Sequence, residues 1–336
     1  MAAAAAERRP SAPNAGGDRA TSTDLASRVL SWGRRGRLKA ILHGSGAVII
    51  LVVLGVVIYG SRDQFQAGGF SPDYLMLFLS FMLWLVGYLM FALGWTLVLR
   101  CIGSPVGWWP ASRVWFLSQG LKYIPGTVFY AAGRVYLAQE AGVRAMPAAL
   151  GLLIENLLPL ATAIIVFLVL LPFGLVEALP NYFAAVALAA LLVLLVSLPL
   201  LVRRLSAAWP KVGNLTLDYK RLPALIAYYL LIWLVVGLAC YLSFRSLGGA
   251  VQVGLLQVLG IYAFSWAAGL VAVFAPGGVG VRDGMLVLLL SGVVPLPVAA
   301  LGAMVVRVQT LAVEGLLALL ALKVWPGRSP LQEDKD

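Results

Sequence analysis

The stretch FAPGGVGVRDG, residues 274–284, has the composition of a chain break that binds an anion. Proline ends a preceding helix, and glycine allows backbone conformations that other residues avoid. Asp283 or a neighbour would cap the start of the next helix. The free amides there would attract an anionic group together with the guanidinium of Arg282. A tight turn with an interfacial arginine is the alternative. The candidate binding residues here are Gly277, Gly278, Gly280, Arg282 and Asp283, and the helix break is Pro276.

A second Pro-Gly break lies in LKYIPGTVFYAAGR, residues 121–134. Pro125 and Gly126 form this helix break, and Lys122 and Arg134 flank it. We expect these two basic side chains to contact an anionic headgroup; the alternative is that they only anchor the segment at an interface with water. The aromatic belt expected at that interface contains Trp108, Trp109 and Trp115.

Charged residues also interrupt two long apolar segments. Glu155 lies in one of them, and Arg307 and Glu314 lie in the other, where a spacing of seven residues places them on nearly the same helical face. Ionisable groups among apolar residues are costly, so they usually face a partner or a wet cavity. One arrangement pairs Glu155 with Arg307 along a polar path; a static ion pair that sets helix register is the alternative. Asn156 and Thr310 are candidates for further polar lining.

The chain offers little to an enzyme or to a metal ion. His43 is its only histidine, and Cys101 and Cys240 lack the spacing of a metal or redox site. Aspartate and glutamate are sparse outside the termini. We therefore expect no catalytic residues, no metal site and no cofactor.

The elements that position these residues must be membrane helices. Hydrophobic residues make up 61% of the 336 residues and charged residues 12%, whereas a soluble protein needs roughly a quarter charged residues. The apolar stretches are long and continuous, unlike the short alternating strands of a β-barrel, and backbone in lipid must satisfy its own hydrogen bonds. The predicted fold class is therefore all-α, a polytopic integral membrane helical bundle.

Stretches of roughly 20 apolar residues, the length that crosses the hydrocarbon, predict about eight transmembrane segments. Two segments, about Thr127–Val143 and Gly284–Val294, follow a Pro-Gly break and are predicted to be interrupted or re-entrant helices. The other candidates are Ala40–Gly60, Leu75–Leu99, Pro147–Leu171, Tyr182–Val202, Pro223–Leu242, Val251–Phe274 and Pro297–Leu322.

Charge between these segments predicts the domain organisation and the orientation. Residues 1–38 form a basic, low-complexity tail, residues 39–325 the transmembrane domain and residues 326–336 a short C-terminal tail. The loops after the second and fourth spans are basic, so the positive-inside rule places the N-terminus in the cytoplasm of a cytoplasmic-membrane protein. The C-terminus is also inside if Gly284–Val294 crosses, as we expect, and outside if that segment is purely re-entrant. The basic residues behind the net charge of +11 lie between apolar spans, which argues against nucleic-acid binding.

An offset of about 151 residues aligns parts of the chain with each other. Pro125-Gly126 then matches Pro276-Gly277, and Ala149-Leu150-Gly151 matches Ala300-Leu301-Gly302. Duplicated halves, about residues 40–202 and 222–325, are one explanation, and interrupted helices at corresponding places would then mark a binding site. Chance matches of small residues are the other explanation.

Three features of the sequence resemble the transmembrane region of lysylphosphatidylglycerol synthases, over about Ala40 to Leu322: KYIPG with a following arginine, a glutamate in the next helix, and PGGVGVRDG before a helix with an arginine. That region defines a broader group of flippase-like proteins, in which it is associated with moving aminoacylated phospholipid between leaflets. Related stand-alone members are linked to polyprenyl-phosphate or glycolipid pathways. The resemblance implies roles for Lys122, Pro125, Gly126, Arg134, Glu155, Pro276, Gly277, Gly278, Gly280, Arg282 and Arg307. Asp283 departs from the glutamate that the family more often has, and the ending SPLQEDKD carries no synthase domain, so we expect no lipid aminoacylation.

The leading hypothesis is a flippase-like protein that binds or translocates a phosphate-bearing lipid, either an aminoacylated phospholipid or a polyprenyl-linked glycolipid. One alternative is a polytopic membrane transferase that uses a polyprenyl-phosphate donor. Another is a non-transporting partner of a separate lipid-modifying enzyme. The expected partners are membrane lipids and, in the last case, that enzyme; the sequence indicates no oligomeric state.

Overall fold

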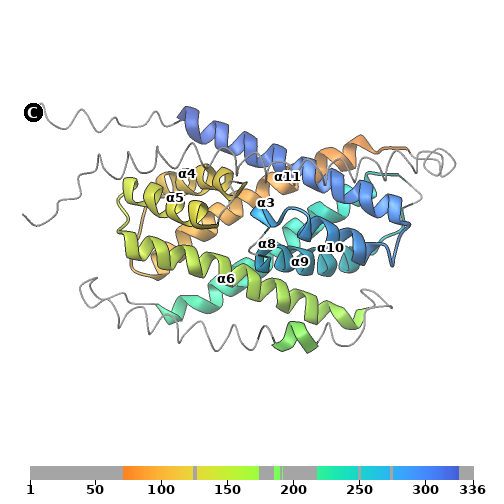
Figure 1. Ribbon diagram of the computed structural model, residues 1–336, viewed down its shortest axis with the longest axis horizontal. Helices are drawn as coiled ribbons and strands as arrows, with labels where there is room; N and C mark the ends of the chain where they lie inside the picture. The colour runs from red at the N-terminus through yellow and green to blue at the C-terminus, as the bar shows by residue number, and fades with distance from the viewer. Residues whose placement is uncertain are drawn as a thin grey trace, which may run out of the picture. The chain divides into compact units, whose positions relative to one another are not determined.

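The computed structural model describes residues 71–123, 127–173, 185–189, 191, 218–248, 251–272 and 275–324. All of them belong to one compact unit, Leu42–Asp336. Within these residues every regular element is a helix, which confirms the all-α part of the predicted fold class (Figure 1). The span predicted at Ala40–Gly60 and the two tails lie outside the described residues, as does most of Tyr182–Val202, of which residues 185–189 and 191 are helical.

Four of the described helices are long and apolar enough to cross a membrane. They are α3 (Tyr74–Cys101), α6 (Ala145–Leu170), α8 (Leu222–Arg245) and α11 (Leu296–Val324). Each coincides with a predicted span, and at about 1.5 Å per residue each exceeds the hydrocarbon thickness of about 30 Å. The total of about eight spans stays a prediction. The short 3₁₀ elements η2 (Leu171–Phe173) and η4 (Tyr219–Arg221) end α6 and precede α8.

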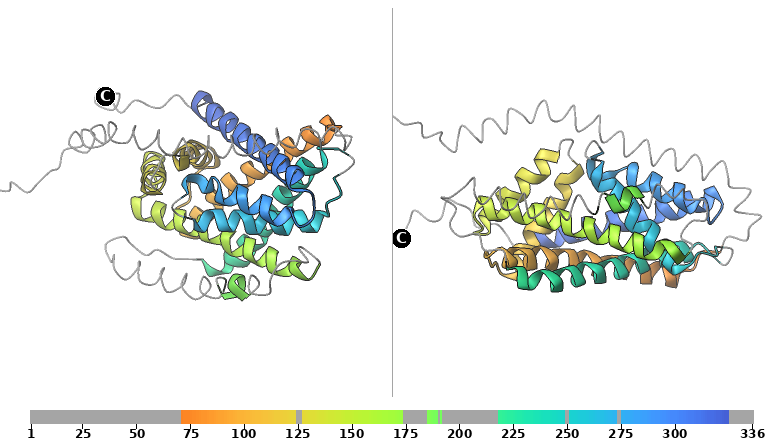
Figure 2. Two further views of the ribbon diagram at one scale, coloured as in Figure 1. Left: turned by 45° about the vertical axis from the view of Figure 1, so that its right-hand side comes forward. Right: turned by 90° about the horizontal axis from the view of Figure 1, so that it is seen from below.

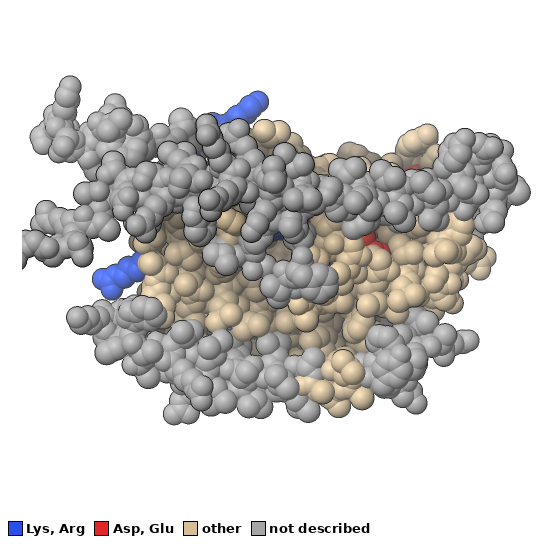
Figure 3. Space-filling view, in the orientation of Figure 1, with Lys and Arg blue, Asp and Glu red and all other residues tan. Residues whose placement is uncertain are grey.

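The outer faces of the long helices are apolar. Large side chains such as Phe78 of α3, Leu234 of α8 and Leu319 of α11 are more than half exposed. On the face drawn in Figure 3 the described surface carries few acidic or basic side chains. In water such a surface would cause association, whereas lipid tails cover it at no cost. The chain is therefore a multi-pass membrane protein.

Helices α3 and α8 run antiparallel. The backbone N–H of Asp73, which caps the start of α3, donates to the carbonyl of Ser246 just after α8 (2.9 Å). At the other end the N–H of Asp218, before α8, donates to the carbonyl of Cys101 at the end of α3 (3.0 Å). The bundle thus has two ends, and we call the one at Cys101 and Asp218 the basic end.

The basic end is named for the exposed basic side chains that gather there. α6 starts at this end, because its Gly151 packs against Leu99 near the end of α3. α11 starts at the opposite end, where Gly302 packs against Phe244 near the end of α8, and its length carries it to the basic end. The exposed basic residues of the basic end are Arg100, Arg144, Lys220, Arg221 and Lys323.

Between α3 and α6 the chain forms a helical hairpin, which we call the first hairpin. It consists of α4 (Trp108–Gln119), η1 (Gly120–Tyr123) and α5 (Thr127–Glu140). Short connections join α4 to the end of α3 and α5 to the start of α6, so the first hairpin enters from the basic end and returns to it. Gly133 of α5 makes the tip compact, because a Cβ there would lie 2.2 Å from Cδ1 of Leu121.

A second hairpin lies between α8 and α11. It consists of α9 (Leu255–Val271), η5 (Pro276–Gly278) and α10 (Val281–Leu290). Because α8 ends and α11 starts at the end opposite the basic one, this hairpin enters from that opposite end. η1 contacts η5, so the tips of the two hairpins meet inside the bundle (Figures 1 and 2). Both predicted interrupted segments are thus return limbs of hairpins, and neither α5 nor α10 is long enough to cross alone.

Three expectations need correction. α4 is a helix that the sequence did not predict, because its twelve residues are too few for a span and its tryptophans were assigned only to an aromatic belt. α9 is shorter than the predicted span Val251–Phe274, since residues 251–254 are not helical. α10 begins at Val281, before Gly284, and its N-cap is Gly280 with no side-chain cap, so neither Asp283 nor a neighbour caps it.

The order of elements repeats along the chain. α3, α4, η1, α5 and α6 are followed by α8, α9, η5, α10 and α11, with opposite direction in the bundle. Matching helices start about 150 residues apart, the arrangement expected of inverted repeats; the start residues pair as Tyr74 with Leu222, Trp108 with Leu255, Thr127 with Val281, and Ala145 with Leu296. The proposed duplication of residues 40–202 and 222–325 stays a prediction at those boundaries.

Candidate functional site

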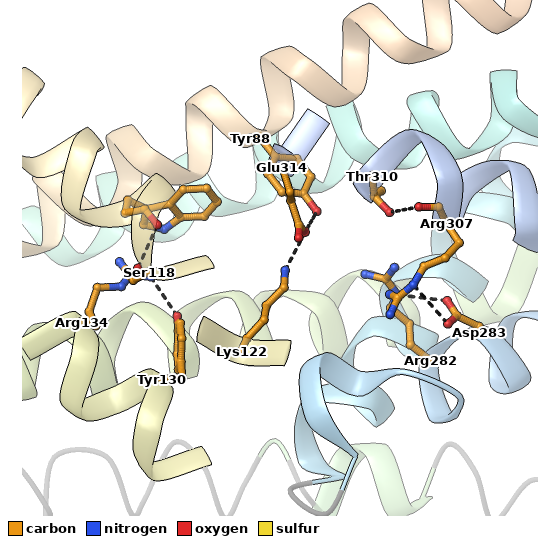
Figure 4. A network of polar contacts seen from close by, with 11 residues as sticks. Tyr88, Ser118, Lys122, Tyr130, Arg134, Arg282, Asp283, Arg307, Thr310 and Glu314 are labelled. Atoms are coloured by element: carbon orange, nitrogen blue, oxygen red, sulfur yellow. Dashed lines mark hydrogen bonds and ion pairs between the residues drawn. The ribbon is translucent and has the colours of Figure 1, made fainter. Parts of the chain in front are cut away.

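Charged side chains converge where the hairpin tips meet. Lys122 comes from η1, Arg282 and Asp283 from the first turn of α10, and Arg307 and Glu314 from α11 (Figure 4). We call these five residues the tip cluster. The sequence predicted each of them as a site residue, and the structure brings them together from three parts of the chain.

One part of the tip cluster joins the first hairpin to α11. Nζ of Lys122 lies 2.6 Å from Oε1 of Glu314, and the hydroxyl of Tyr88 on α3 donates to the same oxygen. Lys122 keeps 22% of its side chain exposed, whereas Glu314 is buried. The pair therefore holds the tip of the first hairpin against α11, and Lys122 is its more exposed member.

The other part joins the second hairpin to α11. Asp283 lies between two guanidinium groups, with Oδ1 3.6 Å from Nε of Arg282 and Oδ2 3.7 Å from Nε of Arg307. All three side chains are buried. The positive charges of Arg282 and Arg307 also act on Lys122 across the junction of the tips. Within the tip cluster three basic side chains thus face two carboxylates, a balance that favours an anion.

Glycines set the position of Arg282. Gly278 has φ of 66°, a left-handed conformation, and a Cβ there would lie 3.1 Å from the carbonyl oxygen of Gly269 on α9. A Cβ on Gly269 would in turn lie 2.8 Å from Cβ of Arg282. The break therefore packs directly on the backbone of α9, and only glycine at both positions permits this contact. Gly277 and Gly280 also have positive φ.

The tip cluster lies at the middle of the long helices. The central residue of α11, which runs from Leu296 to Val324, is Thr310. Arg307 precedes it by one turn and Glu314 follows it by one turn, so both lie within about 6 Å of the midpoint along the axis. Charges at this depth are costly in lipid unless they serve a polar ligand or one another.

Arg134 and Glu155 form a separate buried pair. NH1 of Arg134 lies 3.2 Å from Oε2 of Glu155, and Nε1 of Trp115 donates to Oε1 of Glu155 (2.5 Å). The guanidinium also donates to the hydroxyl of Tyr130 (2.8 Å) and lies 4.9 Å from the ring centroid of Trp95. No part of the Arg134 side chain is exposed.

This geometry corrects two expectations about the charged residues. Glu155 does not pair with Arg307; its partner is Arg134 on the neighbouring α5, while Arg307 pairs with Asp283. Trp115 does not belong to an aromatic belt, because its indole is buried against the Arg134–Glu155 pair. Headgroup contact by Arg134 stays a prediction, and its partners place it in the buried pair.

The remaining predicted residues contribute less. Asn156 donates to the carbonyl of Leu152 (2.7 Å) and Thr310 to that of Arg307 (3.0 Å), both within their own helices. Pro125 and Gly126 lie outside the described residues, between η1 and α5. Pro276 begins η5, as the predicted helix break requires.

Sequence reasoning missed several polar residues of the interior. Tyr88, Ser80, Ser243 and Gln309 are buried and hydrogen-bonded to one another or to the tip cluster. Gln309 carried a signal, since it interrupts the apolar sequence two residues after Arg307. In the described part of the chain no group of three or more histidine, cysteine, aspartate or glutamate side chains has the arrangement of a metal site.

The chain matches a known protein family over most of its length. Residues 45–318 match the family described as "Lysylphosphatidylglycerol synthase TM region". The match includes both hairpins, the tip cluster and the buried pair. None of the curated proteins matches the chain.

Proposed function

Because the chain belongs to the family of the lysylphosphatidylglycerol synthase TM region, we propose that it binds a phosphate-bearing lipid headgroup between its hairpin tips and moves it between leaflets. The candidate lipids are an aminoacylated phospholipid and a polyprenyl-linked glycolipid. The family supports a role in lipid metabolism, and the step to translocation is our inference from the site.

The convergence of three cations at mid-depth carries this proposal. Lys122 and Arg282 come from hairpins that enter from opposite ends, and Arg307 comes from α11, which pairs with both hairpins through Glu314 and Arg307. The uncapped amides at the start of α10 add donors beside Arg282. A phosphate bound here would replace Glu314 and Asp283 as partner of these cations, so its charge would never face hydrocarbon.

The opposed hairpins also supply a route. A headgroup at the tips is separated from the basic end by the first hairpin and from the opposite end by the second. Movement of one hairpin at a time would expose the same site to either side in turn, the alternating access of repeat-built transporters. Lys122, the most exposed member of the tip cluster, would meet the headgroup first.

The orientation is part of the proposal. The exposed basic residues of the basic end support a cytoplasmic position for it under the positive-inside rule, whereas at the opposite end α8 finishes with Arg245. We infer a cytoplasmic-membrane protein with both termini inside. With both hairpins re-entrant, α11 runs from the outer side to the basic end, which keeps the C-terminus inside without Gly284–Val294 crossing.

Lipid transfer in reconstituted vesicles tests the function. We expect Lys122→Ala and Arg282→Ala to slow the transfer of fluorescent phosphatidylglycerol between leaflets by about tenfold or more, because each removes a charge-assisted contact of about 1.5–3 kcal/mol. Arg221→Ala is the matched control, since Arg221 is exposed and pairs with Asp218 away from the tips. Equal transfer in all four proteins, or in protein-free vesicles, would refute the proposal.

We propose transport and not group transfer, and the same preparation separates the two. A transferase would consume a labelled polyprenyl-phosphate donor and release a new product. Transfer of intact lipid without product supports the flippase-like role; product formation would replace it with the enzyme hypothesis. A protein that binds a lipid-modifying enzyme but moves no lipid would instead be a non-transporting partner.

A further inference from the structure

The buried carboxylate of Glu314 shares its cation with the proposed headgroup site. Nζ of Lys122 on η1 lies 2.6 Å from Oε1 of Glu314, and the hydroxyl of Tyr88 on α3 donates to the same oxygen. Glu314 is buried, whereas Lys122 lies at the tip of the first hairpin with 22% of its side chain exposed. A buried carboxylate that loses the cation beside it is strongly destabilised in its charged form. Engagement of Lys122 by a phosphate would therefore leave the charge of Glu314 poorly compensated.

Asp283, the other carboxylate of the tip cluster, is held differently. Its Oδ1 lies 3.6 Å from Nε of Arg282 on α10, and its Oδ2 lies 3.7 Å from Nε of Arg307 on α11. A phosphate that draws one guanidinium away would leave the other beside this carboxylate. The two carboxylates are thus unequal, and Glu314 is the one whose charge a bound headgroup would leave exposed to an apolar interior.

The elements packed against α11 set the charged surroundings of Glu314. They include η1, α3, α4, α8 and α10. α8 packs on the first half of α11, where Ser243 donates to Gln309. Arginine keeps its charge throughout the pH range of cells, and a tyrosine ordinarily loses its proton only near about pH 10, so the acidic residues and Lys122 are the groups able to exchange a proton here. The other elements contribute Lys122 from η1, Tyr88 from α3, Arg113 from α4, and Arg282 and Asp283 from α10.

We propose that Glu314 takes up a proton when an anionic headgroup binds, so that the protein carries a proton together with the lipid. The inference rests on the proposed function, which supplies the headgroup. When a phosphate oxygen accepts a hydrogen bond from Nζ of Lys122, a hydronium ion from the side then open gives its proton to the carboxylate of Glu314, and an O–H bond forms there. Lys122 keeps its own protons throughout. When the headgroup leaves, Lys122 returns to Glu314 and the proton passes back to water.

Charge makes the two binding events favour each other. With both carboxylates ionised the tip cluster carries three positive and two negative charges, and protonation of Glu314 removes one of the negative charges. The protonated protein therefore binds an anion more tightly, and by thermodynamic reciprocity the anion-bound protein binds a proton more tightly. A site that opens to one side at a time would then couple a proton gradient to headgroup movement, with both moving in the same direction.

Calorimetric titration of the purified full chain with glycerophosphoglycerol tests the linkage. This probe is the deacylated headgroup of phosphatidylglycerol, and the charge of its phosphodiester is constant over the pH range of the experiment, so a pH dependence reports on the protein. We expect the affinity to rise as the pH falls, by up to about tenfold per pH unit where binding takes up a full proton. Titrations in two buffers of different ionisation enthalpy count that proton directly in the unaltered protein.

A single variant assigns the proton to Glu314. Glu314→Gln keeps an oxygen that accepts from Tyr88 but cannot ionise, so we expect an affinity that no longer changes with pH and no proton uptake. Glu140→Gln is the matched control, because Glu140 is exposed at the end of α5 and should leave the parent behaviour unchanged. In vesicles, a pH gradient should speed the transfer of fluorescent phosphatidylglycerol in the direction of proton flow for the parent chain and not for Glu314→Gln.

The outcomes separate this inference from the proposed function. Probe binding that is independent of pH and takes up no proton would overturn the linkage and leave the headgroup site standing. The same pH dependence in Glu314→Gln as in the parent would also overturn it, since another group would then titrate. Lipid transfer that ignores the pH gradient would overturn the coupling alone. Proton-linked probe binding without any lipid transfer would support the linkage and remove the transport function, and no probe binding at any pH would refute both.

Discussion

Arg134 and Glu155 illustrate how a buried charge depends on its partner. The pair lies among Trp95, Trp115 and Tyr130 with no exposure of the guanidinium. Removing two charges from water costs several kcal/mol per ion, and the geometry recovers this only while both partners remain. The pair is therefore a point at which a single substitution leaves a charge without compensation.

We expect Glu155→Gln to lower the stability by about 3–5 kcal/mol, because it leaves the guanidinium buried without its carboxylate. The double variant with Arg134→Met should recover most of this loss, since no charge then remains and the amide still accepts from Trp115. Denaturant unfolding of the purified proteins measures both. A double variant no more stable than the single one would contradict this account.

Sequence reasoning identified most of the charged site residues but not their partners. Arg307 and Glu314 stood out because ionisable groups among apolar residues are rare. Lys122 and Arg282 stood out because they lie beside the Pro-Gly breaks. Pairing depends on how each helix rotates about its axis and where it crosses its neighbours. Glu155 turned out to pair across the adjacent α5–α6 contact and not with Arg307, and nothing in the composition around Trp115 indicated that its indole is buried there.

At the scale of elements, the second hairpin depends on close contact between backbones. Gly269 and Gly278 touch where α9 meets the Pro-Gly break, and Arg282 packs on Gly269. Gly284, in the first turn of α10, has open space around it, because a Cβ there would meet no atom within 4 Å. The two kinds of glycine thus have different roles in one short segment.

We expect Gly278→Ala to lower both the Tm and lipid transfer, because it combines a left-handed φ with a Cβ 3.1 Å from a carbonyl oxygen. Gly284→Ala is the control; alanine in an open helical position should be neutral or stabilise by up to about 1 kcal/mol. Thermal unfolding and the vesicle assay report both effects. Equal behaviour of the two variants would show that the contact with α9 does not matter.

The long helices were readable from sequence because length and hydropathy decide them. The hairpins were harder to predict from the sequence. α4 has only twelve residues and a mixed composition, and the return of α5 and α10 follows from contacts with α4 and α9. The Pro-Gly breaks predicted interruption correctly, but not that the two interruptions would meet.

At the scale of the whole bundle, the two hairpins predict a pattern of accessibility. Gln252 precedes α9, Ser291 follows α10 and Glu140 ends α5, and all three are exposed. If the second hairpin is re-entrant, Gln252 and Ser291 lie on one side of the membrane. The basic end, with Glu140, then lies on the other.

We expect Gln252→Cys and Ser291→Cys to react with a membrane-impermeant maleimide in intact cells, and Glu140→Cys only after permeabilisation. The parent chain is the control, since Cys101 and Cys240 are buried. Labelling of Gln252→Cys and Ser291→Cys from opposite sides would mean that the second hairpin crosses. Labelling of Glu140→Cys in intact cells would reverse the orientation.

Helix α11 contacts both hairpins, at η1 and along α10. Its only proline is at its second position, and a continuous ladder of backbone hydrogen bonds resists stretching, so it behaves as a stiff rod over its length. α11 therefore cannot shift along its axis at its contact with one hairpin and stay in place at its contact with the other. In the proposed transport cycle, displacement at Lys122 would therefore also shift the partner of Asp283, so that movement of one hairpin would be linked to movement of the other through α11.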